Sequence, residues 1–302
     1  MFYKVKVSKF KTKKLIEFNK NLNNFFDIKT VIYLKENNSI IQTKAKYLAK
    51  DYKKYKLKEL KNIKKKIISL KKLKYINFTK SPNKMLIKQI QKFLKKNNNI
   101  KFFDYFIIHG SYASNDFIKD FSDLDTFVVI KDECIEDWRK LINLREELKK
   151  FYNILLKYSP FQHHGLICFT NADLKNYSNN LLPVEALKYN LSLINKEKNL
   201  IINSNLSKAS SHRKSLKERL YFIKLAIKKG FYEHHVFGNK MLKVPLERDD
   251  KCIKQFITHV NYMLNIPILF LSSINKNSHK KNSFKIFYKK INNKKIKSFI
   301  IK

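Results

Sequence analysis

Two short apolar segments that flank a polar loop constrain the fold of this chain more than any other feature. Residues 107–130 read IIHGSYASNDFIKDFSDLDTFVVI. The segments 106–108 and 126–130 have the length and the apolar, β-branched character of buried strands. A Gly-Ser pair follows the first segment, and an Asp-Leu-Asp triplet leads into the second. The pattern predicts two strands whose connecting residues serve a functional site rather than the packing of a core.

The spacing of the two aspartates suits a divalent cation. Side chains alternate along a strand, so Asp123 and Asp125 are expected to point to the same face. Mg²⁺ prefers oxygen ligands and is usually held by one or two carboxylates together with substrate phosphates. A turn such as Gly110-Ser111 after a strand can direct backbone N–H groups and a hydroxyl toward a phosphate. The segment therefore predicts a site for a metal-nucleotide complex.

At these residues the chain resembles the nucleotidyltransferase superfamily. The motif of that superfamily is an apolar strand, Gly-Ser, a spacer of about ten residues and Asp-x-Asp on the next strand. Gly110, Ser111, Asp123 and Asp125 match it, and Ser122 precedes the first carboxylate, as the family often has it. Gly-Ser and Asp-Leu-Asp also occur in ordinary surface turns, but the strand-like segments on both sides favour the functional interpretation.

The resemblance covers about residues 84–170 and implies an α+β fold. We expect a small mixed β-sheet nucleotidyltransferase core flanked by helices, with a helical C-terminal domain. The implied substrate is a nucleoside triphosphate, with ATP as the first candidate, and the implied cofactor is Mg²⁺ or Mn²⁺. Asp123 and Asp125 would be the metal ligands and catalytic carboxylates, and Gly110, Ser111 and Ser122 would bind the nucleotide. The reaction would transfer a nucleoside monophosphate with loss of pyrophosphate.

The chain departs from the family at the third carboxylate, which members commonly carry on a later strand. The next strand-like segment, residues 161–170, contains no Asp or Glu. We expect His164, or His163 beside it, to act as the base, because neutral imidazole accepts a proton near physiological pH. A purely structural role for these histidines is the alternative. Asp173 and Glu185 could supply an acid if the following loop folds back.

The charge of the chain raises the question of a polyanionic partner. Lysine and arginine number 65 against 24 acidic residues, a net charge of +41. Such a surface attracts RNA, DNA or anionic membranes. However, the chain is rich in Lys, Asn and Ile, and arginine, which is favoured for bidentate phosphate recognition, is rare. That usage suggests an AT-rich genome, which would spread lysine over the whole surface, so RNA stays a possible partner rather than a required one.

Several features indicate a soluble, cytoplasmic protein. Residues 1–7 alternate like a strand and are interrupted by charges, unlike a secretion signal. The apolar stretch 266–271 is far too short to span a bilayer. The three cysteines are isolated, which favours a reducing compartment over disulfides.

The chain divides by its patterns into three expected regions. Residues 1–80 form a basic α/β region, with a strand at 28–34 and a helix at 53–74. Residues 81–172 form the core, in the order helix, strand, strand, long helix to about Tyr158, strand. Residues 173–302 form the C-terminal domain and end in a lysine-rich tail.

Three helices are expected in the C-terminal domain. They cover residues 183–193, 210–229 and 250–272, and Gly230 fits a cap at the end of the second.

Three classes of function are compatible with these patterns. The first is a nucleotidyltransferase that acts on a hydroxyl of a small molecule, a sugar or a protein. The second is a transferase directed at RNA, such as a tRNA end, which the lysine excess favours. The third is a catalytically silent nucleotide-binding or antitoxin-like protein, which the missing third carboxylate favours. The acceptor, the nucleotide, the number of metals and the oligomeric state are not encoded in a readable pattern.

Overall fold

The computed structural model describes most of the chain and resolves two compact units. The described residues are 2–27, 36–56, 67–69, 74–75, 84–113, 122–158, 162, 166–177, 182, 184–194, 200–203, 209–236, 240–245, 267, 270–271, 280–290 and 292. One unit comprises Met1–Leu206 with Val236–Lys240, and the other Ser207–His235 with Met241–Lys302. The three-part division expected from the sequence stays a prediction.

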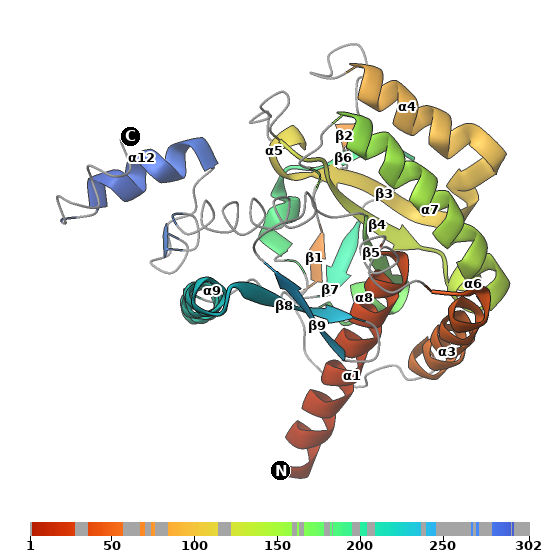
Figure 1. Cartoon of the computed structure of the whole chain (residues 1–302), viewed down its shortest axis with the longest axis horizontal. Coiled ribbons are helices and arrows are strands. Elements are labelled where there is room, and N and C mark those ends of the chain that lie inside the picture. Colours follow the sequence, from red (N-terminus) through yellow and green to blue (C-terminus); the bar gives the residue numbers. More distant parts are fainter. Residues whose placement is uncertain are drawn as a thin grey trace. The chain divides into compact units, whose positions relative to one another are not determined.

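A five-stranded mixed sheet organises the first unit (Figure 1). Its strand order is β2-β6-β3-β4-β5. The strands are β2 (Lys74–Tyr75), β6 (Leu191–Ser192), β3 (Phe103–His109), β4 (Asp125–Ile130) and β5 (Ile167–Thr170). The two central strands, β3 and β4, run antiparallel, and β5 runs parallel to β4.

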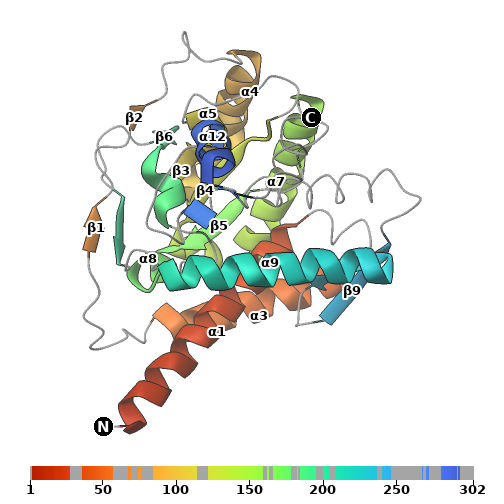
Figure 2. The same ribbon diagram turned by 90° about the vertical axis from the view of Figure 1, so that its left-hand side faces the viewer.

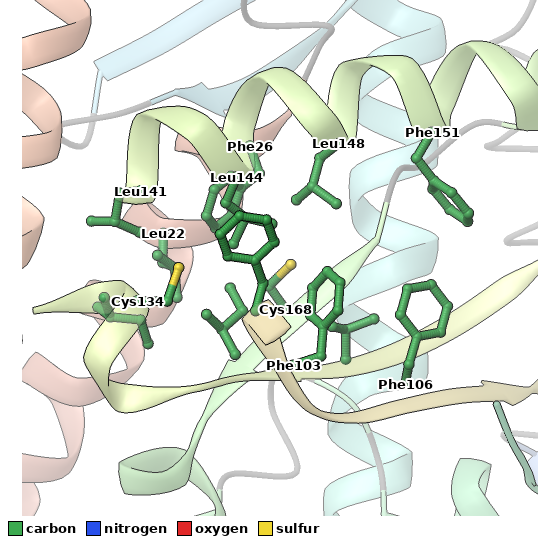
Figure 3. Close-up of a cluster of buried hydrophobic side chains, with 14 of the residues drawn as sticks. Leu22, Phe26, Phe103, Phe106, Cys134, Leu141, Leu144, Leu148, Phe151 and Cys168 are labelled. Carbon is green, nitrogen blue, oxygen red and sulfur yellow. The ribbon is translucent and has the colours of Figure 1, made fainter. Parts of the chain in front are cut away.

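Four helices cover one face of this sheet. They are α1 (Phe2–Phe26), α3 (Asn38–Lys56), α4 (Lys84–Lys95) and α7 (Trp138–Tyr158). Their apolar residues recur every three or four positions, so each helix turns one stripe toward the main core. The buried stripe of α7 meets residues of α1, β3 and β5 in the main core (Figure 3). It consists of Leu141, Leu144, Leu148 and Phe151.

A second, smaller core lies on the opposite face of the sheet. Side chains of β4 alternate between the two faces, so Val128 and Ile130 belong to the main core while Phe127 and Val129 belong to the second. The rings of Phe127 and Phe169 stack with centroids 4.4 Å apart. The elements that cover this face are α8 (Asn171–Lys175), the 3₁₀ helix η2 (Val184–Lys188) and β7 (Ile201–Asn203).

Short elements connect these layers. They are β1 (Ile67–Ser69), which pairs antiparallel with β7, the 3₁₀ helix η1 (Lys96–Phe102), α5 (Gly110–Ala113) and α6 (Asp132–Ile135). In the part of the chain that the structure describes, no helix is long and apolar enough to cross a membrane.

The C-terminal unit contains a long helix, a two-stranded sheet and a shorter helix. They are α9 (Ala209–Lys229), β8 (Phe231–Val236), β9 (Lys240–Pro245) and α12 (Lys280–Lys290). Figure 2 shows α9 along its length. Gly230, between α9 and β8, has a φ of +68°, the left-handed conformation typical of a residue that ends a helix.

A buried ion pair connects two of the helical segments. Arg145 of α7 donates to Glu36, just before α3, over 2.8 Å, and both side chains are almost fully buried. Burial by itself would raise the pKa of Glu36, but hydrogen bonds from Lys44 and Arg145 outweigh it and hold the pKa below its ordinary value. The guanidinium also lies 4.9 Å from the centre of the Phe25 ring in α1. Removing one partner of such a pair leaves an uncompensated buried charge, so the contact fixes α1, α3 and α7 together.

Most of the sequence-based core is confirmed. The α+β class, the order α4, β3, β4, α7, β5 and the end of α9 before Gly230 agree with the expectation. The buried face of α4 includes Leu86, Ile90, Phe93 and Leu94.

Three expectations about secondary structure were wrong. Residues 2–7 are part of α1 rather than a strand, because the helical spacing of Leu15, Phe18, Leu22 and Phe25 docks the helix on the core.

The helix expected over 53–74 is wrong at its C-terminal end, where the structure has strands at Ile67–Ser69 and Lys74–Tyr75. Residues 53–56 belong to α3, and residues 57–66 and 70–73 lie outside the described residues. The segment 183–193 forms only a 3₁₀ turn and then strand β6. In both places pairing with a distant strand overrides the local periodicity. The expected strand at 28–34 and nearly all of the expected helix at 250–272 lie outside the described residues.

Candidate functional site

The glycine turn and the second aspartate of the motif meet in the structure. Gly110 follows the last residue of β3 and has a φ of +67°, which disfavours any side chain. A Cβ atom added there would lie 2.0 Å from Oδ2 and 2.8 Å from Cγ of Asp125. The backbone at position 110 therefore lies directly against the Asp125 carboxylate, and only glycine leaves room for it.

The two aspartates lie at the start of β4, one in the strand and one just before it. Asp125 is the first residue of that strand, and Asp123 lies two residues before it, outside the strand. Leu124, between them, is buried in the main core. Because side chains alternate along a strand, the Asp125 carboxylate faces the side of Phe127 and the second core, and we expect Asp123 to face the same side. Both aspartates are half-buried.

Gln162 holds the backbone between the two aspartates and was not singled out from the sequence. The Leu124 N–H donates to Gln162 Oε1 over 2.9 Å, and Gln162 Nε2 donates to the Leu124 carbonyl over 3.2 Å. The side chain is only 1% exposed. The only sequence signal was a polar amide at the start of the strand-like segment 161–170.

His109 is a second residue that the sequence reasoning missed. It pairs directly with Asp125 across β3 and β4 and is buried. Residues opposite each other in an antiparallel pair project to the same face, with Cβ atoms about 4.5–5.5 Å apart. The imidazole therefore lies on the same side of the sheet as the carboxylates. Its place immediately before Gly110 was the available signal.

The remaining expected site residues differ in how far the structure describes them. Ser111 is buried in α5, immediately after the turn, and Ser122 is half-buried beside Asp123. His163 and His164 lie outside the described residues, so their role as base stays a prediction. The backbone of Glu185 belongs to η2, and its side chain lies outside the described part.

Asp173 does not join this site. Its Oδ2 accepts hydrogen bonds from the N–H and the hydroxyl of Thr170 and from Asn19 Nδ2, in a capping box at the start of α8. Thr170 pairs with Ile130, at the opposite end of β4 from Asp125. A strand rises about 3.3 Å per residue, so the length of β4 separates the two carboxylates. Asp173 is a structural residue of the cap, and an acid at the site from this position is excluded.

The buried Asp173 carboxyl should make folding stability depend on pH. Burial raises its pKa to about 6 from 3.8, against the opposing effect of the hydrogen bonds from Asn19 and Thr170. Since the folded state then holds the proton more tightly than the unfolded chain, the contribution of Asp173 to stability falls as pH rises from about 4 to 6. Asp173→Asn cannot ionise, so its stability relative to wild type should increase over that window, by on the order of 1–3 kcal/mol.

Urea unfolding at pH 4.5 and pH 7 measures this difference. Thr170→Val is the matched control, because it removes a cap hydroxyl but keeps the carboxylate, and should lose stability at both pH values. A stability difference between Asp173→Asn and wild type that is the same at both pH values would contradict the prediction.

The described residues fit a hard divalent cation bound with a polyphosphate. No group of three His, Cys, Asp or Glu side chains within the described ranges could hold a metal by itself. Two carboxylates that flank one residue, with Asp125 lying against a glycine that leaves space for it, match the way Mg²⁺ is bound, with phosphates and water completing its ligands.

Comparison with known proteins gives one finding that bears on this site. Residues 87–223 match the family model of the nucleotidyltransferase domain, a segment that contains β3, β4, β5 and both halves of the motif. Searches of curated proteins and of solved structures gave no match.

Proposed function

We propose, from the match of residues 87–223 to the nucleotidyltransferase-domain family model, that the chain moves a nucleoside monophosphate from a nucleoside triphosphate to an acceptor hydroxyl. The observation that carries the proposal is the contact between Gly110 and Asp125. The contact supports the proposal because Gly110 and Asp125 belong to the two halves of the motif and come from the paired neighbouring strands β3 and β4. An ordinary surface turn would not require a glycine pressed against a carboxylate.

Each described residue of the site has a proposed task. Asp123 and Asp125 bind Mg²⁺ or Mn²⁺, and Ser111, Ser122 and the backbone at Gly110 orient the triphosphate. The cation, when bound, neutralises charge on the phosphate oxygens as a Lewis acid. The protein contributes mainly by aligning the acceptor hydroxyl with the α-phosphorus, because nucleotidyl transfer needs little covalent participation from side chains. His164 is the proposed base for the acceptor proton.

RNA is the second candidate acceptor, supported by α9 as well as by the net charge. Arg213, Lys214 and Lys217 are exposed on this helix, and Tyr221 is 68% exposed. Basic side chains beside an exposed aromatic ring are a combination that binds single-stranded RNA through phosphate contacts and base stacking.

Transfer of label from the α-phosphate tests the proposal. The purified chain is incubated with Mg²⁺ or Mn²⁺ and each of the four nucleoside triphosphates, labelled at the α- or the γ-phosphate, together with total RNA or a small-molecule extract. We expect α-label in an acceptor and γ-label only in pyrophosphate. α-Label in RNA would assign the second candidate. Transfer of γ-label to an acceptor would contradict nucleotidyl transfer, and calorimetry without Mg²⁺-dependent nucleotide binding would favour a catalytically silent, antitoxin-like protein.

A further inference from the structure

We propose that Gln162 is a positioning residue that sets the spacing of Asp123 and Asp125 by holding the backbone of Leu124. The inference rests on the proposed function, because the spacing matters only if the two carboxylates share a cation. Nothing in the Gly-Ser and Asp-x-Asp motif includes this residue, which lies 37 positions beyond Asp125 in the sequence.

The hydrogen bonds of Gln162 take the place of strand pairing at Leu124. The pairs between β3 and β4 run as far as His109 with Asp125, and those between β4 and β5 begin at Phe127 with Ile167. Leu124 therefore precedes both sets of pairs. The Gln162 amide satisfies its N–H and its carbonyl together, as a neighbouring strand would. This contact keeps the backbone extended through Leu124, so that the residues on either side project to one face.

Gln162 is itself held in place. The backbone carbonyl of Gln162 accepts a hydrogen bond of 3.2 Å from the Tyr152 hydroxyl of α7. Burial raises the pKa of Tyr152 to about 12, with a smaller effect from Asp27, so the phenol remains a donor at physiological pH. Tyr152, Gln162 and Leu124 thus form a buried series of contacts from α7 to the carboxylates. Geometry fixed in this way allows two ligands to receive a cation without first rearranging.

Asn23 provides an internal comparison for this role. Its side chain makes the same type of contact in α1: Nδ2 donates to the Cys168 carbonyl over 2.8 Å, and Oδ1 accepts from the Cys168 N–H over 2.8 Å. The residue held is in the middle of β5, and its neighbours Ile167 and Phe169 are apolar. Loss of the Asn23 contact should therefore lower stability without affecting a metal site.

Mn²⁺ binding in the presence of a non-hydrolysable ATP analogue tests the inference. Gln162→Met preserves the length of the side chain but removes both hydrogen bonds to Leu124, and Asn23→Leu is the matched control. The concentration of free Mn²⁺ is followed by electron paramagnetic resonance. We expect the Mn²⁺ dissociation constant to rise about 10- to 100-fold in Gln162→Met, the usual effect of losing a group that orients metal ligands. It should stay within about twofold of wild type in Asn23→Leu, because that contact only supports folding.

The outcomes separate the two proposals. If the wild-type chain binds no Mn²⁺ with the analogue, the proposed function fails. If the wild type binds and Gln162→Met binds equally well, the role of Gln162 is wrong. An equal loss in Asn23→Leu would also overturn it, because the effect would then be one of general stability.

Tyr152→Phe serves if Gln162→Met does not fold. It keeps Gln162 and removes only the hydrogen bond to its carbonyl, and should weaken Mn²⁺ binding by a few-fold. An unchanged dissociation constant in Tyr152→Phe would then contradict the inference.

Discussion

Replacing Asp125 with asparagine should lower the rate of nucleotidyl transfer by about a thousandfold or more while leaving the fold intact. Asparagine has the same shape but no charge, so the proposed cation loses a carboxylate ligand beside the Gly110 turn. A bound cation supplies several kcal/mol of charge stabilisation in the transition state, and about 1.4 kcal/mol corresponds to a tenfold change in rate. The loss should appear in kcat with any acceptor that the wild type uses.

The stability of Asp125→Asn should move in the opposite direction to its activity. Two half-buried carboxylates flank Leu124, and without a cation their like charges repel. Neutralising one of them should leave the free energy of unfolding unchanged or raise it by about 0.5–1 kcal/mol. A residue kept at the expense of stability is typical of a functional site.

Asp104→Asn is the matched control for this variant. Asp104 is also a half-buried aspartate of the sheet, but it lies near the start of β3, at the other end of the strand from Gly110, and accepts a hydrogen bond from Asn171. It should retain activity despite the same change in charge. The prediction is wrong if Asp125→Asn, folded by circular dichroism, transfers nucleotide as fast as wild type.

The second large effect is expected from Gly110→Ala. An alanine Cβ at this position would lie 2.0 Å from Asp125 Oδ2, far inside van der Waals contact, so the carboxylate or the turn must shift. The left-handed backbone at Gly110 adds about 1–2 kcal/mol of strain for a residue with a side chain. We expect kcat to fall at least about a hundredfold, because displacements near 1 Å in a catalytic site have effects of that size.

Gly230→Ala separates the effect of backbone strain from that of the steric clash with Asp125. Gly230 has nearly the same φ, +68°, and an added Cβ there would meet no atom within 4 Å. Both variants should lose the stability expected from backbone strain, measured by urea unfolding. Only Gly110→Ala should also lose activity. Equal activities in the two variants would show that the approach of Gly110 to Asp125 has no catalytic consequence.

Sequence reasoning succeeded where local pattern and tertiary structure agree. The Gly-Ser turn is recognisable because its glycine must accommodate a carboxylate, and β3, β4 and α7 carry apolar patterns that the core preserves. Strand β6 could not be predicted, because its two residues become a strand by pairing with β3 on one side and with β2 on the other. Local sequence contains no record of such a distant partner.

The same limit applies to the site. The side chain of Gln162 bonds only to the backbone N–H and carbonyl of Leu124 in these two contacts. Because every residue type except proline offers both groups, the contact leaves no pattern in the sequence around Leu124. Asp173 illustrates the opposite error. A carboxylate after a strand suggested a possible acid, but Thr170 and Asp173 satisfy each other in a capping box. The sequence Thr-x-x-Asp at the start of a helix was the overlooked signal.

The hydrogen bonds between Asn23 and Cys168 protect the outer edge of strand β5. β5 is a terminal strand of the five, and an unprotected terminal strand invites pairing with a strand from another molecule. Here an amide from α1 already occupies the outward N–H and carbonyl in the middle of β5. The helix thus blocks extension of the sheet at β5, and removing it would expose an unpaired strand edge there.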